Sequence, residues 1–186
     1  MFKVFLMSFF TVVILTGAIT SKAEQVPIFN EPFPAYDNEK LIGRWDKNGG
    51  AISFFVRQVD GKKQARMLTT DESGDVKFVL DLRPVDVEDI EELLEDTLKK
   101  MGNPDTLPIP PLGTREVTTM VGKLIYPVAE IRTFIVDPAG TQRYVMLRIK
   151  GKKGAKFEQN VYWMDRPDLK SLEKLMDKVL DETGES

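Results

Sequence analysis

The sequence predicts an α+β domain in which two helices pack on one antiparallel sheet of about seven strands. In several short segments apolar residues recur at every second position, which is typical of strands with one buried face. Two other segments carry apolar residues at helical spacing, and turn residues separate all of these segments. The predicted order of elements is β-β-β-α-β-β-β-β-α, an arrangement in which the helices cover a sheet built from hairpins.

The first run of elements comprises three strands, within residues 51–61, 63–70 and 76–84, and one helix over 86–101. The strands place these apolar residues on one face: Ile52, Phe54, Val56, Ala65, Met67, Val76, Phe78, Leu80 and Leu82. The helix carries a stripe of Ile90, Leu93, Leu94, Leu98 and Met101. Acidic residues begin this helix, with Asp86 able to cap it, and two lysines precede the glycine that ends it.

The second run follows a proline-rich loop over 103–113 and comprises four strands and a final helix over 168–182. The strands lie within 115–126, 129–136, 141–150 and 155–165, and in the last of these Phe157, Val161 and Trp163 are expected to face the core. Asp165 is expected to cap the final helix, with Pro167 near its first position. The two runs suggest a duplication, but the residues show no repeat that supports one.

The N-terminus has the layout of a secretory signal peptide. Lys3 precedes an apolar run over 4–19, and Ser21-Lys22-Ala23 forms a small-residue cleavage site, so residues 1–23 are expected to be removed. The alternative is an uncleaved membrane anchor, for which the apolar run is short. Residues 24–40 would form an extended proline-rich arm and residues 41–183 a single α+β domain. We therefore expect a secreted or periplasmic protein of a bacterium.

The absence of histidine and cysteine excludes many kinds of chemistry. Zinc sites of His and Cys, cysteine nucleophiles, Ser-His-Asp triads and histidine general bases all require these residues. The formal net charge of −3 is not typical of a general nucleic-acid binder. Residues 71–75 contain three acids but fit a hairpin turn better than a calcium loop. The acids of the 86–101 helix are expected to be solvated with ordinary pKa values. We expect no catalytic residue, metal or cofactor.

Two fragments resemble lipocalins. Residues 37–45, DNEKLIGRW, resemble the entry segment in which a Gly-x-Trp begins the first strand, and residues 161–166, VYWMDR, are similar to the end motif. This resemblance implies that Arg166 stacks on Trp45 and that a closed barrel holds an apolar ligand. The order of elements also resembles the PsbP-like fold, which implies an exported accessory module. Without either resemblance, Trp45 is an aromatic residue at the edge of the core.

The face opposite the predicted core is also partly apolar, which indicates a binding surface unless the N-terminal arm or the 103–113 loop covers it. The candidate ligand- or partner-binding residues are Trp45, Phe55, Phe134, Tyr144, Met146, Tyr162 and Arg166. A basic patch consists of Arg148, Lys150, Lys152, Lys153 and Lys156. It could contact an anionic envelope surface, or form a solvated turn that protects a sheet edge.

The sequence predicts an exported binding or accessory module of the bacterial envelope. It would hold a protein partner or a small apolar ligand on a sheet face, and it would not bind nucleic acid. One alternative is a lipocalin-like carrier of a small hydrophobic ligand. Another is a hydrolase that works through carboxylates, because Asp, Glu, Lys, Tyr and Thr are what remains for catalysis.

Overall fold

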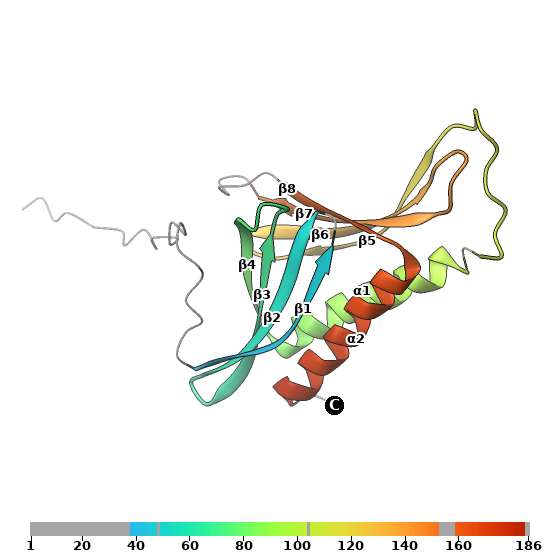
Figure 1. Ribbon diagram of the computed structural model, residues 1–186. Helices are drawn as coiled ribbons and strands as arrows, with labels where there is room; N and C mark the ends of the chain where they lie inside the picture. Colours follow the sequence, from blue (N-terminus) through green and yellow to red (C-terminus); the bar gives the residue numbers. More distant parts are fainter. Residues whose placement is uncertain (1–37, 48, 104, 153–158, 185–186) are drawn as a thin grey trace, which may run out of the picture. The chain divides into compact units, whose positions relative to one another are not determined.

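The computed structural model describes residues 38–47, 49–103, 105–152 and 159–184 (Figure 1). Within them it contains eight strands and two helices, which confirms the α+β class. The prediction of one sheet of about seven strands is wrong, because the strands form two separate four-stranded antiparallel sheets. The predicted signal peptide, and the predicted arm up to residue 37, lie outside the described residues.

The first sheet has the order β1-β2-β3-β4, formed by Glu39–Lys47, Gly50–Val59, Lys62–Thr70 and Val76–Leu82. The sequence prediction missed β1. Its register shifts between Leu41 and Gly43, so a bulge interrupts the alternation on which strand prediction depends. Residues 39 and 40, which were assigned to the arm, belong to this strand.

The second sheet has the order β5-β6-β7-β8, formed by Val117–Ile125, Ala129–Asp137, Tyr144–Gly151 and Gln159–Met164. Its first strand also contains a bulge, between Met120 and Gly122. The β6 residues Ile131, Thr133 and Ile135 are buried, as the alternation predicts. The outward-facing residues of this sheet form the surface described in the next section.

The helices α1 (Pro84–Met101) and α2 (Arg166–Thr183) follow β4 and β8. The predicted stripe of α1 is buried, and each such leucine contributes about 1.5–3 kcal/mol when fully removed from water. The α1 helix begins at Pro84, so Asp86 is not its N-cap residue but lies in its first turn. There the Asp86 carboxylate accepts a hydrogen bond from the Arg83 backbone N–H at 2.8 Å. Asp165 caps α2 as predicted, because its carboxylate accepts the Asp168 backbone N–H at 2.8 Å.

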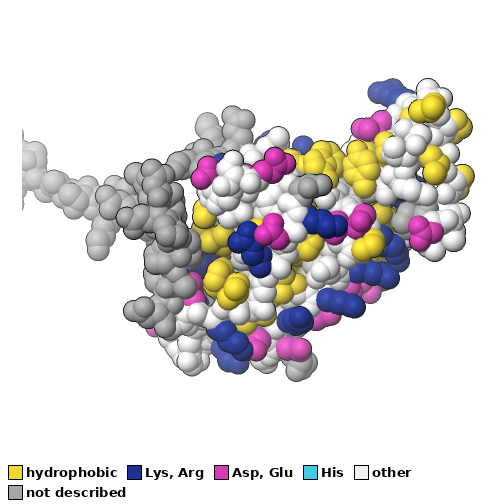
Figure 2. Space-filling model, viewed as in Figure 1, with side chains coloured by type: hydrophobic (Ala, Val, Ile, Leu, Met, Phe, Trp, Pro, Cys, Tyr) yellow, Lys and Arg dark blue, Asp and Glu magenta, His cyan; other side chains and the backbone are white. Residues whose placement is uncertain are grey.

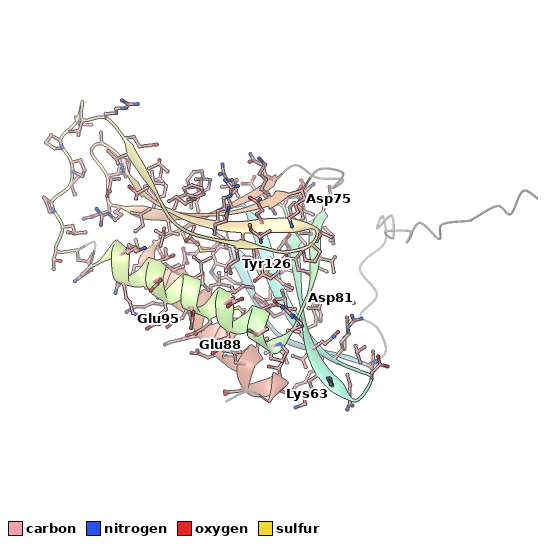
Figure 3. All side chains as sticks on the ribbon, turned by 180° about the vertical axis from the view of Figure 1, so that it is seen from behind. Lys63, Asp75, Asp81, Glu88, Glu95 and Tyr126 are labelled. Atoms are coloured by element: carbon pink, nitrogen blue, oxygen red, sulfur yellow. The ribbon has the colours of Figure 1, made fainter. Side chains whose placement is uncertain are left out.

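One hydrophobic core joins both sheets and both helices. The two sheets meet along one side, and the helix pair packs in the opening between them (Figure 1). The helices are exchanged between the sheets. The α1 helix packs mainly on β5 and β6 of the second sheet, whereas α2 packs mainly on β1, β2 and β3 of the first sheet. Seen from behind, α1 runs along the second sheet with Glu88 and Glu95 on its side away from that sheet (Figure 3).

The structure shows the same order of four strands and a helix twice in the chain. Residues 39–102 and 117–184, called here the N-terminal and C-terminal repeats, each form four strands and a helix. The bulge segment 41–45, LIGRW, matches 120–124, MVGKL. A Cβ on Gly43 would lie 2.5 Å from Leu175 Cδ1 of α2, and a Cβ on Gly122 would lie 2.5 Å from Leu93 Cδ1 of α1.

The paired glycines explain the Gly-x-Trp motif. At both bulges the terminal methyl of a helix leucine lies so close that a side chain on the strand would force this methyl to shift. Gly43 therefore marks the site where α2 contacts the first sheet, and Gly122 marks the equivalent contact of α1 with the second sheet. The match between the two segments is conservative and not identical, so it is not recognisable without the register of the strands.

Candidate binding surface

The outer face of the second sheet carries a row of four large apolar side chains. Met120 pairs with Phe134, Phe134 pairs with Met146, and Met146 pairs with Trp163, so the four residues lie side by side across all four strands. Met120 is 53% exposed and Trp163 is 45% exposed, while Phe134 and Met146 are half-buried. We call this set the apolar row. Figure 2 shows hydrophobic side chains gathered over the second sheet along the upper edge of the view.

The apolar row is exposed because the opposite face of each strand already packs in the core. In β7, Val145, Leu147 and Ile149 are buried, so the intervening Met146 faces outward. In β5 the bulge turns Met120 outward, while Val121 on its C-terminal side packs against the core. Most apolar residues of a one-sided sheet face inward, and the ordered row on the outer face is therefore the candidate binding surface of the described residues.

Ring contacts hold several side chains of this face in fixed positions. Tyr144 packs edge-to-face on Trp163, with ring centroids 5.4 Å apart and an interplanar angle of 76°. The Arg148 guanidinium lies 4.7 Å from the Phe134 ring centroid, which is a cation–π contact. Burial, followed by the nearby Glu116 carboxylate, raises the pKa of the Tyr144 hydroxyl. The ring contacts therefore restrict the positions of several side chains of this surface.

A row of cations runs beside the apolar row. Lys123 pairs with Arg132, and Arg132 pairs with Arg148, so these three residues form what we call the cationic row. Arg132 binds the Glu130 carboxylate and holds the pKa of that carboxyl below its usual value. The Nε of Arg148 is buried and has no hydrogen-bond partner within the described residues.

The equivalent positions on the first sheet have a different character. By strand register they are Leu41, Phe55, Arg66 and Asp81. Arg66 binds Asp81 at 2.8 Å and lies 2.6 Å from a carboxylate oxygen of Glu39, so charged residues replace half of the row. The apolar row is therefore a property of the C-terminal repeat and is not imposed by the shared fold.

The structure brings together three of the predicted binding residues and separates the others. Phe134, Tyr144 and Met146 lie on the outer face of the second sheet. Phe55 lies on the first sheet and does not join them. Trp45, Tyr162 and Arg166 do not belong to this surface.

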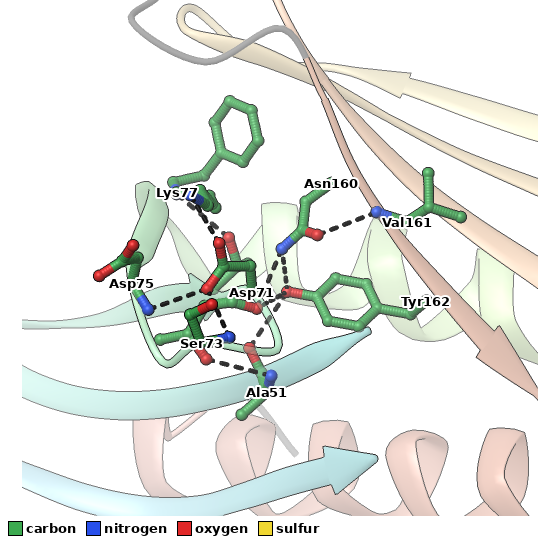
Figure 4. Close-up of polar contacts among 11 residues, drawn as sticks. Ala51, Asp71, Ser73, Asp75, Lys77, Asn160, Val161 and Tyr162 are labelled. Atoms are coloured by element: carbon green, nitrogen blue, oxygen red, sulfur yellow. Dashed lines mark hydrogen bonds and ion pairs between the residues drawn. The ribbon is translucent and has the colours of Figure 1, made fainter. Parts of the chain in front are cut away.

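Tyr162 is fully buried and connects the two sheets, so its assignment to the outer face is wrong (Figure 4). Its hydroxyl accepts a hydrogen bond from Asn160 Nδ2 at 2.8 Å and lies 3.1 Å and 3.0 Å from the carbonyl oxygens of Ala51 and Thr70. Burial raises the pKa of this hydroxyl. In β8 the residues that face inward are Asn160, Tyr162 and Met164, and the predicted orientation of that strand is reversed.

The contact between Trp45 and Arg166 that the lipocalin resemblance implies is not formed. Trp45 is 5% exposed and packs edge-to-face on Tyr162 at 5.8 Å, as expected for a residue at the edge of the core. Arg166 instead donates to the carbonyl oxygens of Leu98, at 3.1 Å, and of Gly102, which are the unpaired acceptors at the end of α1. Two four-stranded sheets also replace the closed barrel.

Two residues of the apolar row escaped the sequence prediction. Trp163 was assigned to the core, because β8 is apolar on both faces and the alternation alone does not determine which face is buried. Met120 lies next to the β5 bulge, where the alternation fails. The sequence alone carried no signal for Met120, because the match between LIGRW and MVGKL is recognisable only with the strand register, which places Met120 at the position equivalent to the equally exposed Leu41.

The predicted basic patch is only partly described. Arg148 belongs to the cationic row, Lys150 is exposed on the same strand, and Lys152 is half-buried. Lys153 and Lys156 lie outside the described residues.

Other features of the described residues favour structural roles. The cavity in the core, lined by residues such as Phe54, Leu94 and Met176, holds about 10 Å³, which is close to the space needed by one water molecule. Asp71 forms the predicted turn by accepting the backbone N–H groups of Ser73 and Asp75 at 3.0 Å. In the described part of the chain, no three side chains converge as metal ligands.

One acid of α1 departs from the expectation of an ordinary pKa. Burial, and then the carboxylate of Asp177 on α2, raise the pKa of Glu91. The group lies where the two helices pack together, so it is less solvated than the amphipathic pattern suggests.

Comparison with known proteins found no match, either among protein-family models or among curated proteins. Neither helix in the described ranges is both long and apolar enough to cross a membrane. The fold and the outer face of the second sheet define this chain as an α+β protein with an organised apolar surface.

Proposed function

We propose that this protein is an exported binding module that docks a protein partner on the outer face of its second sheet. The observation that carries the proposal is the apolar row, which crosses all four strands in register and ends in two exposed residues, Met120 and Trp163. Met, Trp, Tyr and Arg are enriched at protein interfaces, and all four occur on this face.

The preorganised side chains support a protein partner in particular. The contacts of Tyr144 with Trp163 and of Arg148 with Phe134 already restrict the side-chain rotamers. A partner of complementary shape then loses less conformational entropy on binding. The small core cavity does not favour the alternative of a carrier that encloses a hydrophobic ligand. Export is proposed from the composition of residues 1–23.

The proposal is tested by comparing two exposed apolar residues, one on the outer face of each sheet. Affinity capture from cells that produce the chain would use the full chain and the variants Trp163→Ser and Leu41→Ser, with quantitative mass spectrometry of the bound proteins. We expect a specific partner whose recovery falls at least about tenfold with Trp163→Ser, as for loss of an aromatic anchor of an interface, and is unchanged with Leu41→Ser.

The proposal fails if the same proteins are recovered equally with both variants, or if none is recovered above an unrelated bait. Circular dichroism and thermal unfolding of both variants establish that each remains folded. Because both side chains are partly exposed, neither substitution is expected to lower the melting temperature by more than a few degrees.

A further inference from the structure

We infer that the partner presents acidic side chains directly beside apolar ones, so that its carboxylates meet the cationic row while its apolar side chains cover the apolar row. This inference rests on the proposed function, because it specifies the chemistry of what docks on the same face. Charge complementarity and the spacing of the two rows point to this partner.

The two rows are adjacent on the outer face. Phe134 and Arg132 are successive outward-facing residues of β6, and Met146 and Arg148 are successive outward-facing residues of β7. Successive residues on one face of a strand are about 6.5–7 Å apart. A partner segment that covers the apolar row therefore brings its neighbouring side chains within reach of the cations.

Two of the three cations form no direct ion pair with a carboxylate in the described residues. Arg132 binds Glu130, Lys123 acts on the same carboxylate only at longer range, and Arg148 forms no ion pair within the described ranges. Arg148 is fixed over the Phe134 ring, so its guanidinium lies at the border between the two rows. A carboxylate that approaches there gains a charge-assisted hydrogen bond while its apolar neighbour contacts Phe134.

The geometry favours a protein segment over an anionic lipid surface. The central residues Phe134 and Met146 are half-buried and lie within a sheet face, so they do not project as membrane-inserting side chains do. Tyr144 and Trp163 are also packed on one another and not extended toward a bilayer. Such a face fits a partner with its own shape better than it fits a bilayer.

The test selects peptides on the purified protein, because the natural partner is unidentified. A random peptide library displayed on phage would be selected on the full chain and counter-selected on Trp163→Ser. We expect the retained peptides to be enriched in Asp or Glu within two positions of Leu, Phe or Trp. The selected peptide with the highest affinity would then be titrated against two variants with the same loss of charge.

The first variant, Lys123→Gln with Arg148→Gln, removes two cations beside the apolar row. The matched control, Lys170→Gln with Lys178→Gln, removes two exposed cations from α2. We expect the first variant to weaken binding of the peptide about tenfold or more, and added salt to weaken binding to the parent protein, as for a charged contact at an interface. The control is expected to bind within about twofold of the parent protein, because surface charges far from a contact are largely screened.

The outcomes distinguish the acidic character of the partner from the existence of the docking surface. Peptides that depend on Trp163 but lack acidic residues, or that bind both charge variants equally, overturn the acidic partner and leave the docking surface intact. If the selection yields no peptide that depends on Trp163, this result contradicts the docking surface itself. Binding of vesicles containing phosphatidylglycerol that is lost in the first charge variant would overturn the inference in favour of a lipid surface.

Discussion

The hydroxyl of Tyr162 is expected to stabilise the fold by joining the two sheets, so Tyr162→Phe should destabilise the protein. This hydroxyl accepts a hydrogen bond from Asn160 on its own sheet. It also donates to a carbonyl oxygen of Ala51 or Thr70 on the first sheet. The substitution removes one oxygen atom from a fully buried site and leaves the packing of the ring unchanged.

The magnitude follows from the hydrogen bonds that are lost. The single hydroxyl proton serves one carbonyl at a time, so the variant loses two hydrogen bonds, one accepted and one donated. At about 1 kcal/mol each, the free energy of unfolding should fall by about 2 kcal/mol. For a chain of this size that corresponds to a decrease in melting temperature of roughly 4–8 °C.

Urea denaturation followed by tryptophan fluorescence measures this change, and Tyr144→Phe is the matched control. The Tyr144 hydroxyl makes no hydrogen bond within the described residues and its ring is half-buried, so its loss should change stability by less than about 0.5 kcal/mol. Equal stability of the two variants would refute the stabilising connection between the sheets.

Three further predictions concern the helices and the repeats. Gly43→Ala and Gly122→Ala should each destabilise the protein by about 1 kcal/mol in urea denaturation, because each added methyl forces the terminal methyl of a packed helix leucine to shift; a change in only one of them would contradict the equivalence of the bulges. Glu91→Gln should stabilise the protein by about 0.5 kcal/mol at pH 7, with Glu88→Gln as the exposed control. Folding raises the pKa of Glu91, so the protonated carboxyl costs no stability at a pH below its unfolded pKa, and the ionised carboxyl destabilises the fold as pH rises through the folded pKa. The stability gained by Glu91→Gln should therefore vanish near about pH 3. A gain in stability that persists at that pH would contradict the electrostatic cause. Fragments holding the N-terminal and C-terminal repeats should be unfolded alone and fold on mixing, as seen by circular dichroism, because each helix packs mainly on the other repeat's sheet; a repeat that folds alone would refute the exchange.

Much of the secondary structure followed from the sequence because most elements have one buried face. In β2, β6 and β7 the buried residues of the core face alternate with less buried ones over most of the strand, and the stripe of α1 follows the helical period. The cap of α2 could be predicted because an Asp that directly precedes a helix commonly accepts a hydrogen bond from a backbone N–H of the first turn, as Asp165 does. These features depend on residues that are close together in the chain.

The errors arose where local pattern does not determine long-range structure. Two sheets and one sheet give the same alternation within each strand, so the break between β4 and β5 was invisible. The polar residue Asn160 was expected to face outward, but its amide is satisfied in the core by Tyr162 and Thr70. Because side chains alternate along β8, the inward position of Asn160 places Trp163 on the outer face, where it forms one end of the apolar row.

The measurement that tests the docking surface most directly is site-specific photo-crosslinking. A photoreactive amino acid would replace Met120 in one variant and Leu41 in another, two residues that are each 53% exposed and occupy equivalent positions of the two repeats. We predict a covalent adduct with one protein partner from position 120 and none from position 41 in cells that produce the chain. The same adduct from both positions, or an adduct from position 41 alone, would contradict the assignment of binding to the outer face of the second sheet.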